Sequence, residues 1–292
     1  MKLDVYQSLW AMELRRPDGR ERSLEESFEM VATAGFDGMS IDFGATDMAT
    51  AYKAKPLFEK YQLGCLFTAF PKTIEQLRPV LRMAREFGAP FVNVIGQVMP
   101  ISVEATVPVV RRWIEMAEQE QVEIQFETHR NSVTNDMFAM LQLLDAVPEM
   151  VISADLSHYV VGREFDYPVS AAAQEHIARI LRRAGSLQGR IASRQQIQVP
   201  FGFPQYRKWL DVFLAWWEQG FRDWRRRAPA TARLNFLCEL GPHEYAMTGP
   251  DGYELSDRWD EALILRDHAR AIWARLDAEA SAASESDRPV GS

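Results

Sequence analysis

The sequence lacks several features that would assign it to large classes of protein. Among its 292 residues are only two cysteines, Cys65 and Cys238, which lie in separate apolar runs without the CxxC spacing of a thiolate metal site. Neither a disulfide framework nor a cysteine-bound metal is predicted. No apolar run approaches the roughly 20 residues that span a bilayer. Residues 1–6 carry no basic segment followed by an apolar one, so we expect a cytoplasmic protein with no membrane partner.

Positive charge is also scarce. The chain has 33 Lys and Arg against 41 Asp and Glu, which gives a formal net charge of −8. Non-specific binding to nucleic acid requires Lys and Arg clustered over an extended face. The one basic run, Arg225-Arg226-Arg227, ends a predicted helix, where it complements the negative end of the helix dipole. We therefore expect no nucleic-acid partner.

Short runs rich in β-branched and aromatic residues alternate with longer segments of helical period. The strands are predicted at Leu3–Leu9, Gly38–Phe43, Gly64–Phe70, Phe91–Gln97, Val122–His129, Val151–His158, Gly189–Arg194 and Leu234–Leu240. Helices are predicted after a capping box at Ser23–Glu26, and at Ile74–Phe87, Val103–Glu120, Ala171–Ala184 and Trp259–Leu276. This alternation is typical of parallel strands joined by right-handed crossovers. Eight such units predict an α/β fold of the (β/α)8 TIM barrel type.

An open doubly wound sheet shows the same alternation, but it usually carries a Gly-rich turn between a strand and its helix. The segment Ala34–Gly38 does not match such a turn and looks like the end of a helix leading into a strand. No linker or repeat divides the chain, so a single domain is expected over residues 1–279. Residues 280–292 are mostly small and polar, and they predict a disordered tail.

Carboxylates follow three of the predicted strands. Glu127 ends the fifth, Asp155 the sixth and Glu239 the eighth. A single carboxylate at a strand end is more often a helix cap or a surface ion pair. In a TIM barrel, however, the strand ends meet at one mouth, where three such groups would repel one another strongly. A divalent cation bound among them is the simplest way to neutralise that charge.

These residues lie in the segments that carry a resemblance to a known family. The chain resembles the xylose-isomerase-like TIM barrels of the sugar phosphate isomerase/epimerase family through Glu127–Arg130, Ser153–His158 and Glu239–Tyr245. The resemblance implies that Glu127, Asp155 and Glu239 bind a metal and that His158 contacts the substrate or a ligand. It also departs from the family at one position. Gln188, in Gln188–Ala192, stands where the family has a metal-binding histidine.

A glutamine can still bind a metal through its side-chain oxygen. The implied ligand set Glu127, Asp155, Gln188 and Glu239 is then all oxygen, which favours Mn²⁺ or Mg²⁺ over Zn²⁺. The alternative is a weakened or empty site. Arg190 lies two residues beyond Gln188 and is expected to contact substrate, as are His129 and Arg130, although pairing with a neighbouring carboxylate explains the last two almost as well.

The resemblance implies a metal-dependent isomerase or epimerase that acts on a sugar or keto-sugar through an enediolate, with Glu127 and Glu239 moving protons. A lyase that cleaves 3-keto-glycosides by β-elimination remains open, as does a non-catalytic sugar-binding barrel. The related endonuclease IV binds three zinc ions and needs many histidines, whereas this chain has only five. An endonuclease of that kind is therefore not expected. Four tryptophans between Trp209 and Trp224 predict either a buried helix face or a subunit contact, so a homo-oligomer is possible.

Overall fold

The computed structural model describes residues 1–286 and contains a closed barrel of eight parallel strands in chain order. The strands are β1 (Lys2–Ser8), β2 (Gly38–Asp42), β3 (Gly64–Ala69), β4 (Val92–Val94), β5 (Ile124–Glu127), β6 (Ile152–Ala154), β7 (Ala184–Gly189) and β8 (Arg233–Cys238). The barrel closes where β1 pairs with β8, from Lys2 opposite Arg233 to Gln7 opposite Cys238. The predicted single-domain (β/α)8 TIM barrel is confirmed in its fold.

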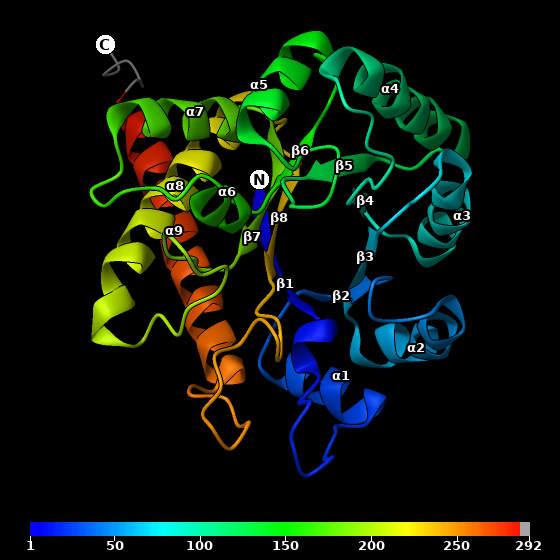
Figure 1. The fold of residues 1–292 in the computed structure, drawn as a ribbon, viewed down its shortest axis with the longest axis vertical. Coiled ribbons are helices and arrows are strands. Elements are labelled where there is room, and N and C mark those ends of the chain that lie inside the picture. The colour runs from blue at the N-terminus through cyan, green and yellow to red at the C-terminus, as the bar shows by residue number, and fades with distance from the viewer. Residues whose placement is uncertain (287–292) are drawn as a thin grey trace, which may run out of the picture.

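Helices surround the barrel, so that the strands occupy the centre of the molecule (Figure 1). They are α1 (Leu24–Thr33), α2 (Met48–Tyr61), α3 (Leu77–Phe87), α4 (Val103–Glu120), α5 (Met137–Ala146), α6 (Ser157–Gly162), α7 (Ala171–Leu181), α8 (Arg207–Arg227) and α9 (Arg258–Ser286), with 3₁₀ turns η1 (Trp10–Met12), η2 (Ile74–Gln76) and η3 (Pro204–Tyr206). The capping box predicted before the first helix is present between Ser23 and Glu26, and Gly35 takes the positive φ expected after that helix.

The seventh strand lies earlier in the chain than the sequence pattern predicts. The predicted range Gly189–Arg194 is wrong, because β7 is Ala184–Gly189 and α7 ends at Leu181, ahead of the predicted helix end at Ala184. Small and polar residues give β7 a weak strand pattern, and its register comes from pairing with β6 and β8. The residues after β7 look like a strand because Ile191 and Ala192 are apolar, but they pack as buried loop.

The barrel interior changes character from one end to the other. Toward the amino ends of the strands, Tyr6 fills the space beside two glycines, because a Cβ at Gly38 or Gly64 would come within 2.2 Å of the Tyr6 side chain. Further up, Ser186 donates to Gln125 at 2.6 Å. The middle of the barrel interior therefore contains polar side chains, and above it lies the mouth where the chemistry of such barrels is found.

The tryptophan-rich helix α8 faces the barrel. Its four tryptophans, at positions 209, 216, 217 and 224, are all buried in the chain, and Trp217 packs edge-on against Phe236 of β8 with ring centroids 5.0 Å apart. The prediction that these tryptophans form a buried helix face is confirmed. They leave no exposed face for a subunit contact, so the homo-oligomer stays a prediction that these residues do not support.

The last helix passes the predicted domain boundary. α9 continues to Ser286, so residues 280–286 are helical where a disordered tail is predicted. Residues 287–292 of the predicted tail lie outside the described residues.

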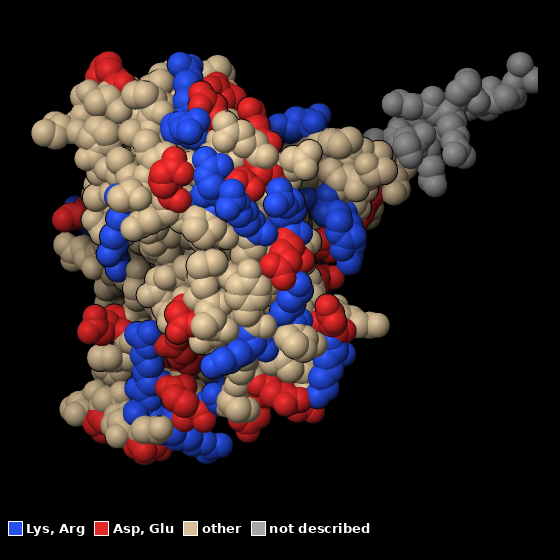
Figure 2. Space-filling model, turned by 90° about the vertical axis from the view of Figure 1, so that its right-hand side faces the viewer, with Lys and Arg blue, Asp and Glu red and all other residues tan. Residues whose placement is uncertain are grey.

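The surface mixes charges of both signs. Figure 2 shows acidic and basic side chains interspersed on the face turned toward the viewer. Some of them are paired, as where Arg78 and Arg82 of α3 both contact Glu120 of α4. Within residues 1–286, no helix has the length and apolar character needed to cross a membrane.

Candidate metal centre

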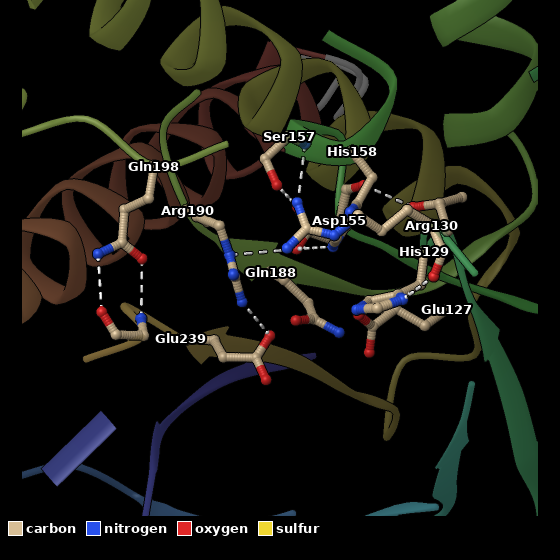
Figure 3. Close-up of polar contacts among 12 residues, drawn as sticks. Glu127, His129, Arg130, Asp155, Ser157, His158, Gln188, Arg190, Gln198 and Glu239 are labelled. Carbon is tan, nitrogen blue, oxygen red and sulfur yellow. Dashed lines mark hydrogen bonds and ion pairs between the residues drawn. The ribbon is translucent and has the colours of Figure 1, made fainter. Parts of the chain in front are cut away.

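The four residues expected to bind metal meet at the carboxyl ends of the strands. Glu127 is the last residue of β5, Gln188 lies one residue before the end of β7, and Asp155 and Glu239 directly follow β6 and β8. One oxygen from each of the three carboxylates lies within 4.8 Å of the others. The close-up shows Glu127, Gln188 and Glu239 pointing toward a common centre (Figure 3). The structure thus brings together side chains that are far apart in the sequence.

Several oxygens of this cluster are buried without a hydrogen-bond partner among residues 1–286. They are Oε1 of Glu127, Oδ2 of Asp155 and Oε1 of Gln188. Their other polar atoms are held in place. Asn93 donates to Oε2 of Glu127, Ser157 donates to Oδ1 of Asp155 from both its backbone nitrogen and its hydroxyl, and Nε2 of Gln188 donates to Ser153 at 3.3 Å. Fixed side chains with one free oxygen each are arranged as metal ligands are.

The buried carboxylates influence one another's protonation. Burial raises the pKa of Glu127 well above its usual value, and the charges of Glu239 and Asp155 raise it further. Burial also raises the pKa of Asp155, against the opposing charge of Arg190. Burial raises the pKa of Glu239 to about 8, again with Arg190 acting in the opposite direction. A cation at the centre would favour the charged form of all three groups.

Among residues 1–286, Arg190 is the cation that lies within the cluster itself. It directly follows β7, its Nη2 donates to Oε2 of Glu239 at 2.9 Å, and its Nε lies 3.4 Å from Oδ2 of Asp155. Burial opposes its charge, but Asp155 and Glu239 raise its pKa. The guanidinium also lies over the ring of Tyr245, 4.7 Å from its centroid, and 5.9 Å from that of Trp10. Arg190 is therefore bound to two of the expected metal ligands.

The residues present fit a hard divalent cation. Three carboxylates and one guanidinium leave a formal charge of −2, which a divalent ion would neutralise. The donor atoms are carboxylate and amide oxygens, the ligands that Mg²⁺ and Mn²⁺ prefer over softer nitrogen and sulfur donors. Gln188 offers its oxygen to the same centre where the family pattern has a histidine nitrogen.

The three remaining predicted site residues lie on one side of this cluster. His158, in the first turn of α6, is buried with Nε2 at 3.5 Å from Oδ2 of Asp155. The ring of His129 lies 4.0 Å from that of His158, measured between centroids. Arg130 is exposed, and its guanidinium lies 4.9 Å from the centroid of Tyr245. All three thus border the carboxylate cluster.

Two residues that help to build the site are not predicted from the sequence. Asn93 of β4 is buried and donates a hydrogen bond to Glu127. The ring of Tyr245 packs against the guanidinium groups of both Arg190 and Arg130. A polar asparagine in an otherwise apolar strand run is a signal that could have identified the first. Nothing in the local pattern around Tyr245 indicates its role, because the loop after β8 has no periodicity.

The loop that follows Glu239 is fastened to the loop after β7. The side chain of Gln198 accepts from the backbone nitrogen of Gly241 at 2.8 Å and donates to its carbonyl oxygen at 2.9 Å. A side chain at Gly241 would meet the ring of Trp10 at 2.4 Å, so glycine is needed there for close packing. Trp10 in turn packs edge-on against Tyr245 with centroids 5.2 Å apart. These contacts hold the β8 end of the site in place.

Comparison with known proteins gives matches at the level of structure alone. No family model matches the sequence, and no curated protein matches it. A xylose isomerase-like TIM barrel protein from Mycobacterium smegmatis, solved in complex with magnesium, has a TM-score of 0.63 at 12% identity, over 92% of this chain and 96% of that one. The chain therefore shares the TIM-barrel fold of that protein.

Two enzymes of this fold also match along most of their length. D-allulose 3-epimerase from Methylomonas sp., solved with D-allulose, has a TM-score of 0.58 at 14% identity, over 94% of this chain and 97% of that one. The "probable 3-DHS dehydratase" from Bacillus anthracis has a TM-score of 0.53 at 15% identity, over 84% of this chain and 95% of that one. Identities this low establish the fold of this chain and not its activity.

Proposed function

We propose that this chain is a divalent-metal-dependent isomerase or epimerase that acts on a sugar or keto-sugar. The observation that carries the proposal is the cluster of Glu127, Asp155 and Glu239, buried at the barrel mouth with oxygens within 4.8 Å of one another and two of those side chains each keeping one oxygen free of hydrogen bonds. The magnesium bound to one protein of similar fold and the D-allulose bound to another support a metal and a sugar respectively.

The ion would be held by Glu127, Asp155, Gln188 and Glu239, with Mg²⁺ or Mn²⁺ preferred to Zn²⁺ because the donors are oxygens. When bound, the ion supplies Lewis acidity, which polarises a substrate carbonyl and makes the neighbouring C–H bond more acidic. The protein's own part is to hold the ligands and to move the proton.

Glu127 and Glu239 are the proposed proton carriers. They come from β5 and β8, well-separated strands of the closed barrel, and so approach a substrate from different sides. Oε2 of Glu239 accepts from Arg190, so Oε1 is the atom that takes or gives the proton. Burial raises the pKa of Glu239, and a bound cation would lower it again and favour the carboxylate form that can accept a proton. A proton returned to the opposite face gives an epimer, and one returned to the adjacent carbon gives an isomer.

The proposed substrate contacts lie around the carboxylates. Nη1 of Arg190 is buried without a hydrogen-bond partner among residues 1–286 and can donate to a substrate oxygen. His158, His129 and Arg130 border the same space and can bind hydroxyl groups. Tyr245 and Trp10 add apolar ring faces of the kind on which sugar C–H groups pack.

A lyase is the second candidate, because an enediolate can also expel a leaving group from its β-carbon. One protein of similar fold is named as a probable dehydratase, an enzyme that eliminates water, and this similarity supports a lyase as an alternative function. The substrate would be a 3-keto-glycoside, and the product would be a free aglycone.

The test is an assay of the full chain with Mg²⁺ or Mn²⁺ against ketopentoses, ketohexoses and 3-keto-glycosides in D₂O. Deuterium incorporated beside the carbonyl together with a new epimer or isomer, both lost on chelation, is the expected result. Release of aglycone supports the lyase. Retention of sugar and metal without deuterium exchange or turnover would contradict the proposal and indicate a binding protein.

A further inference from the structure

A second group of possible metal ligands shares one residue with the carboxylate cluster. One donor atom each from Glu127, His129 and His158 lies within 4.8 Å of the others. The proposed function does not use this group as a metal site, since it needs one ion and oxygen donors. Two imidazoles with a carboxylate form a different donor set, which suits ions such as Zn²⁺ and Co²⁺.

His129 is oriented as metal-binding histidines usually are. Its Nδ1 contacts the carbonyl oxygen of Arg130, so the ring proton belongs on Nδ1. This tautomer leaves the lone pair on Nε2, the atom that a metal requires. The imidazole is therefore oriented for ligation through Nε2.

His158 is the more buried partner. Its side chain is 1% exposed, and neither ring nitrogen has a hydrogen-bond partner among residues 1–286, although Nε2 lies 3.5 Å from Asp155. Buried polar groups are ordinarily bonded, so an imidazole with two unused nitrogens needs a ligand to account for it. Oε1 of Glu127 is unpartnered in the same way.

The segment that carries His129 is firmly fixed. Its backbone nitrogen donates to Oγ1 of Thr134 at 3.1 Å, and its carbonyl oxygen accepts from Ser132 at 2.6 Å. Thr134 also donates to the carbonyl oxygen of Glu127, and its own carbonyl accepts from Tyr159, two residues along the helix from Ser157, at 2.6 Å. One buried network thus positions both His129 and Glu127.

We propose that Glu127, His129 and His158 bind a second divalent cation of the Zn²⁺ or Co²⁺ class, with Glu127 shared between the two sites. Donors on one tetrahedral zinc ion lie about 3.4 Å apart, given metal–ligand distances of about 2.1 Å. The three donor atoms lie within 4.8 Å of one another and would approach by up to about 1.4 Å when they bind the ion.

The charges around the second site allow a cation there. Arg190 is neutralised by Asp155 and Glu239, and Arg130 is exposed to solvent, which screens its charge. The ion would lie near two carboxylates, Glu127 among its own ligands and Asp155 beside His158.

The experiment counts the ions that the full chain binds after chelation and dialysis. We expect two equivalents of Co²⁺ but one of Mg²⁺, since Mg²⁺ does not favour imidazole. His129→Ala and His158→Ala should each lose one equivalent of Co²⁺, and His268→Ala on α9 is the matched control. In the wild type, the Co²⁺ form should also show paramagnetically shifted imidazole N–H signals in the proton NMR spectrum.

The outcomes separate this proposal from the proposed function. Glu239→Gln should weaken the first site and keep the shifted imidazole signals of the second. A wild type that binds a single Co²⁺, retained by His129→Ala, would overturn the second site while leaving the first. His158→Asn, which preserves polarity, is used if His158→Ala unfolds, and circular dichroism checks each variant. Two equivalents that persist in both histidine variants would also reject the assignment.

Discussion

Arg190 donates a hydrogen bond of 2.9 Å to Glu239 at a point where both side chains are almost completely buried. The same guanidinium lies 3.4 Å from Asp155, so one cation serves two carboxylates. Breaking a buried pair leaves an uncompensated charge, which costs more than the pair itself contributes. The stability of the site is therefore tied to Arg190 whenever no other cation is present.

Replacing Arg190 by methionine should destabilise the metal-free protein by about 3 kcal/mol. Added Mg²⁺ or Mn²⁺ should recover much of that loss, because an ion that binds only the folded state stabilises it. Thermal unfolding with and without metal measures both effects. Arg194→Met is the control, since that arginine makes exposed ion pairs. Equal metal responses in the wild type and Arg190→Met would contradict this account.

Replacing Glu239 by glutamine should abolish exchange of the substrate proton with D₂O, because the variant cannot take up a proton there. The hydrogen bond from Arg190 can still be accepted by the amide oxygen, so the fold should persist. Proton NMR in D₂O follows the exchange. Glu244→Gln, in the loop after β8, is the control and should exchange normally. Full exchange in Glu239→Gln would remove Glu239 from the proton path.

Replacing Gln188 by histidine should shift metal preference toward Zn²⁺. An imidazole nitrogen replaces an oxygen donor, and we expect about a tenfold gain in Zn²⁺ affinity over Mg²⁺, equivalent to about 1.4 kcal/mol. Competition with a chromophoric chelator measures the two affinities. Gln188→Leu, with no donor atom, should weaken both ions. A Gln188→Leu variant that binds metal as the wild type does would show that Gln188 is not a ligand.

Replacing Gln198 by alanine should release the loop that follows Glu239. The variant loses both hydrogen bonds to Gly241 and leaves two buried backbone groups unpaired, which should cost about 2 kcal/mol. Denaturant unfolding measures this loss, and turnover should fall as Glu239 loses its fixed position. The exposed Gln195→Ala is the control. Unchanged stability would show that the loop is held by its other contacts.

The stability of the chain should also depend on pH through Glu261 of α9. Burial raises the pKa of Glu261 to about 7, with Glu254 raising it further. The folded state then holds a proton that the unfolded state gives up near its ordinary value of 4.5, so stability falls as pH rises from about 4.5 to about 7. Glu261→Gln should be more stable than wild type at pH 8, by about 2 kcal/mol.

The measurement is denaturant unfolding at pH 5 and pH 8. The gain from Glu261→Gln should be present at pH 8 and nearly absent at pH 5. Asp260→Asn, at an exposed position in the same helical turn, is the control and should show no such difference. A gain of equal size at both pH values would assign the effect to packing instead of charge.

Much of the fold follows from local pattern. Seven strand predictions match observed strands and the eighth shares only Gly189 with β7, because apolar strand runs and helical periods can be recognised from neighbouring residues. For α4, the predicted range Val103–Glu120 is identical to the observed helix. The position of β7 could not be read in this way, since its weak strand pattern is overridden by pairing with β6 and β8.

The sequence by itself determined the barrel and the carboxylates that close three of its strands, because strand ends in a closed parallel barrel must meet at one mouth. Only the tertiary structure decided which atoms at that mouth remain free. Asn93, Ser157 and Arg190 each occupy one side of a carboxylate, and those contacts depend on strands whose spacing along the chain carries no such information. Hydrogen bonds between distant segments are set by three-dimensional packing, so the free oxygens and the second histidine cluster became visible only in the fold.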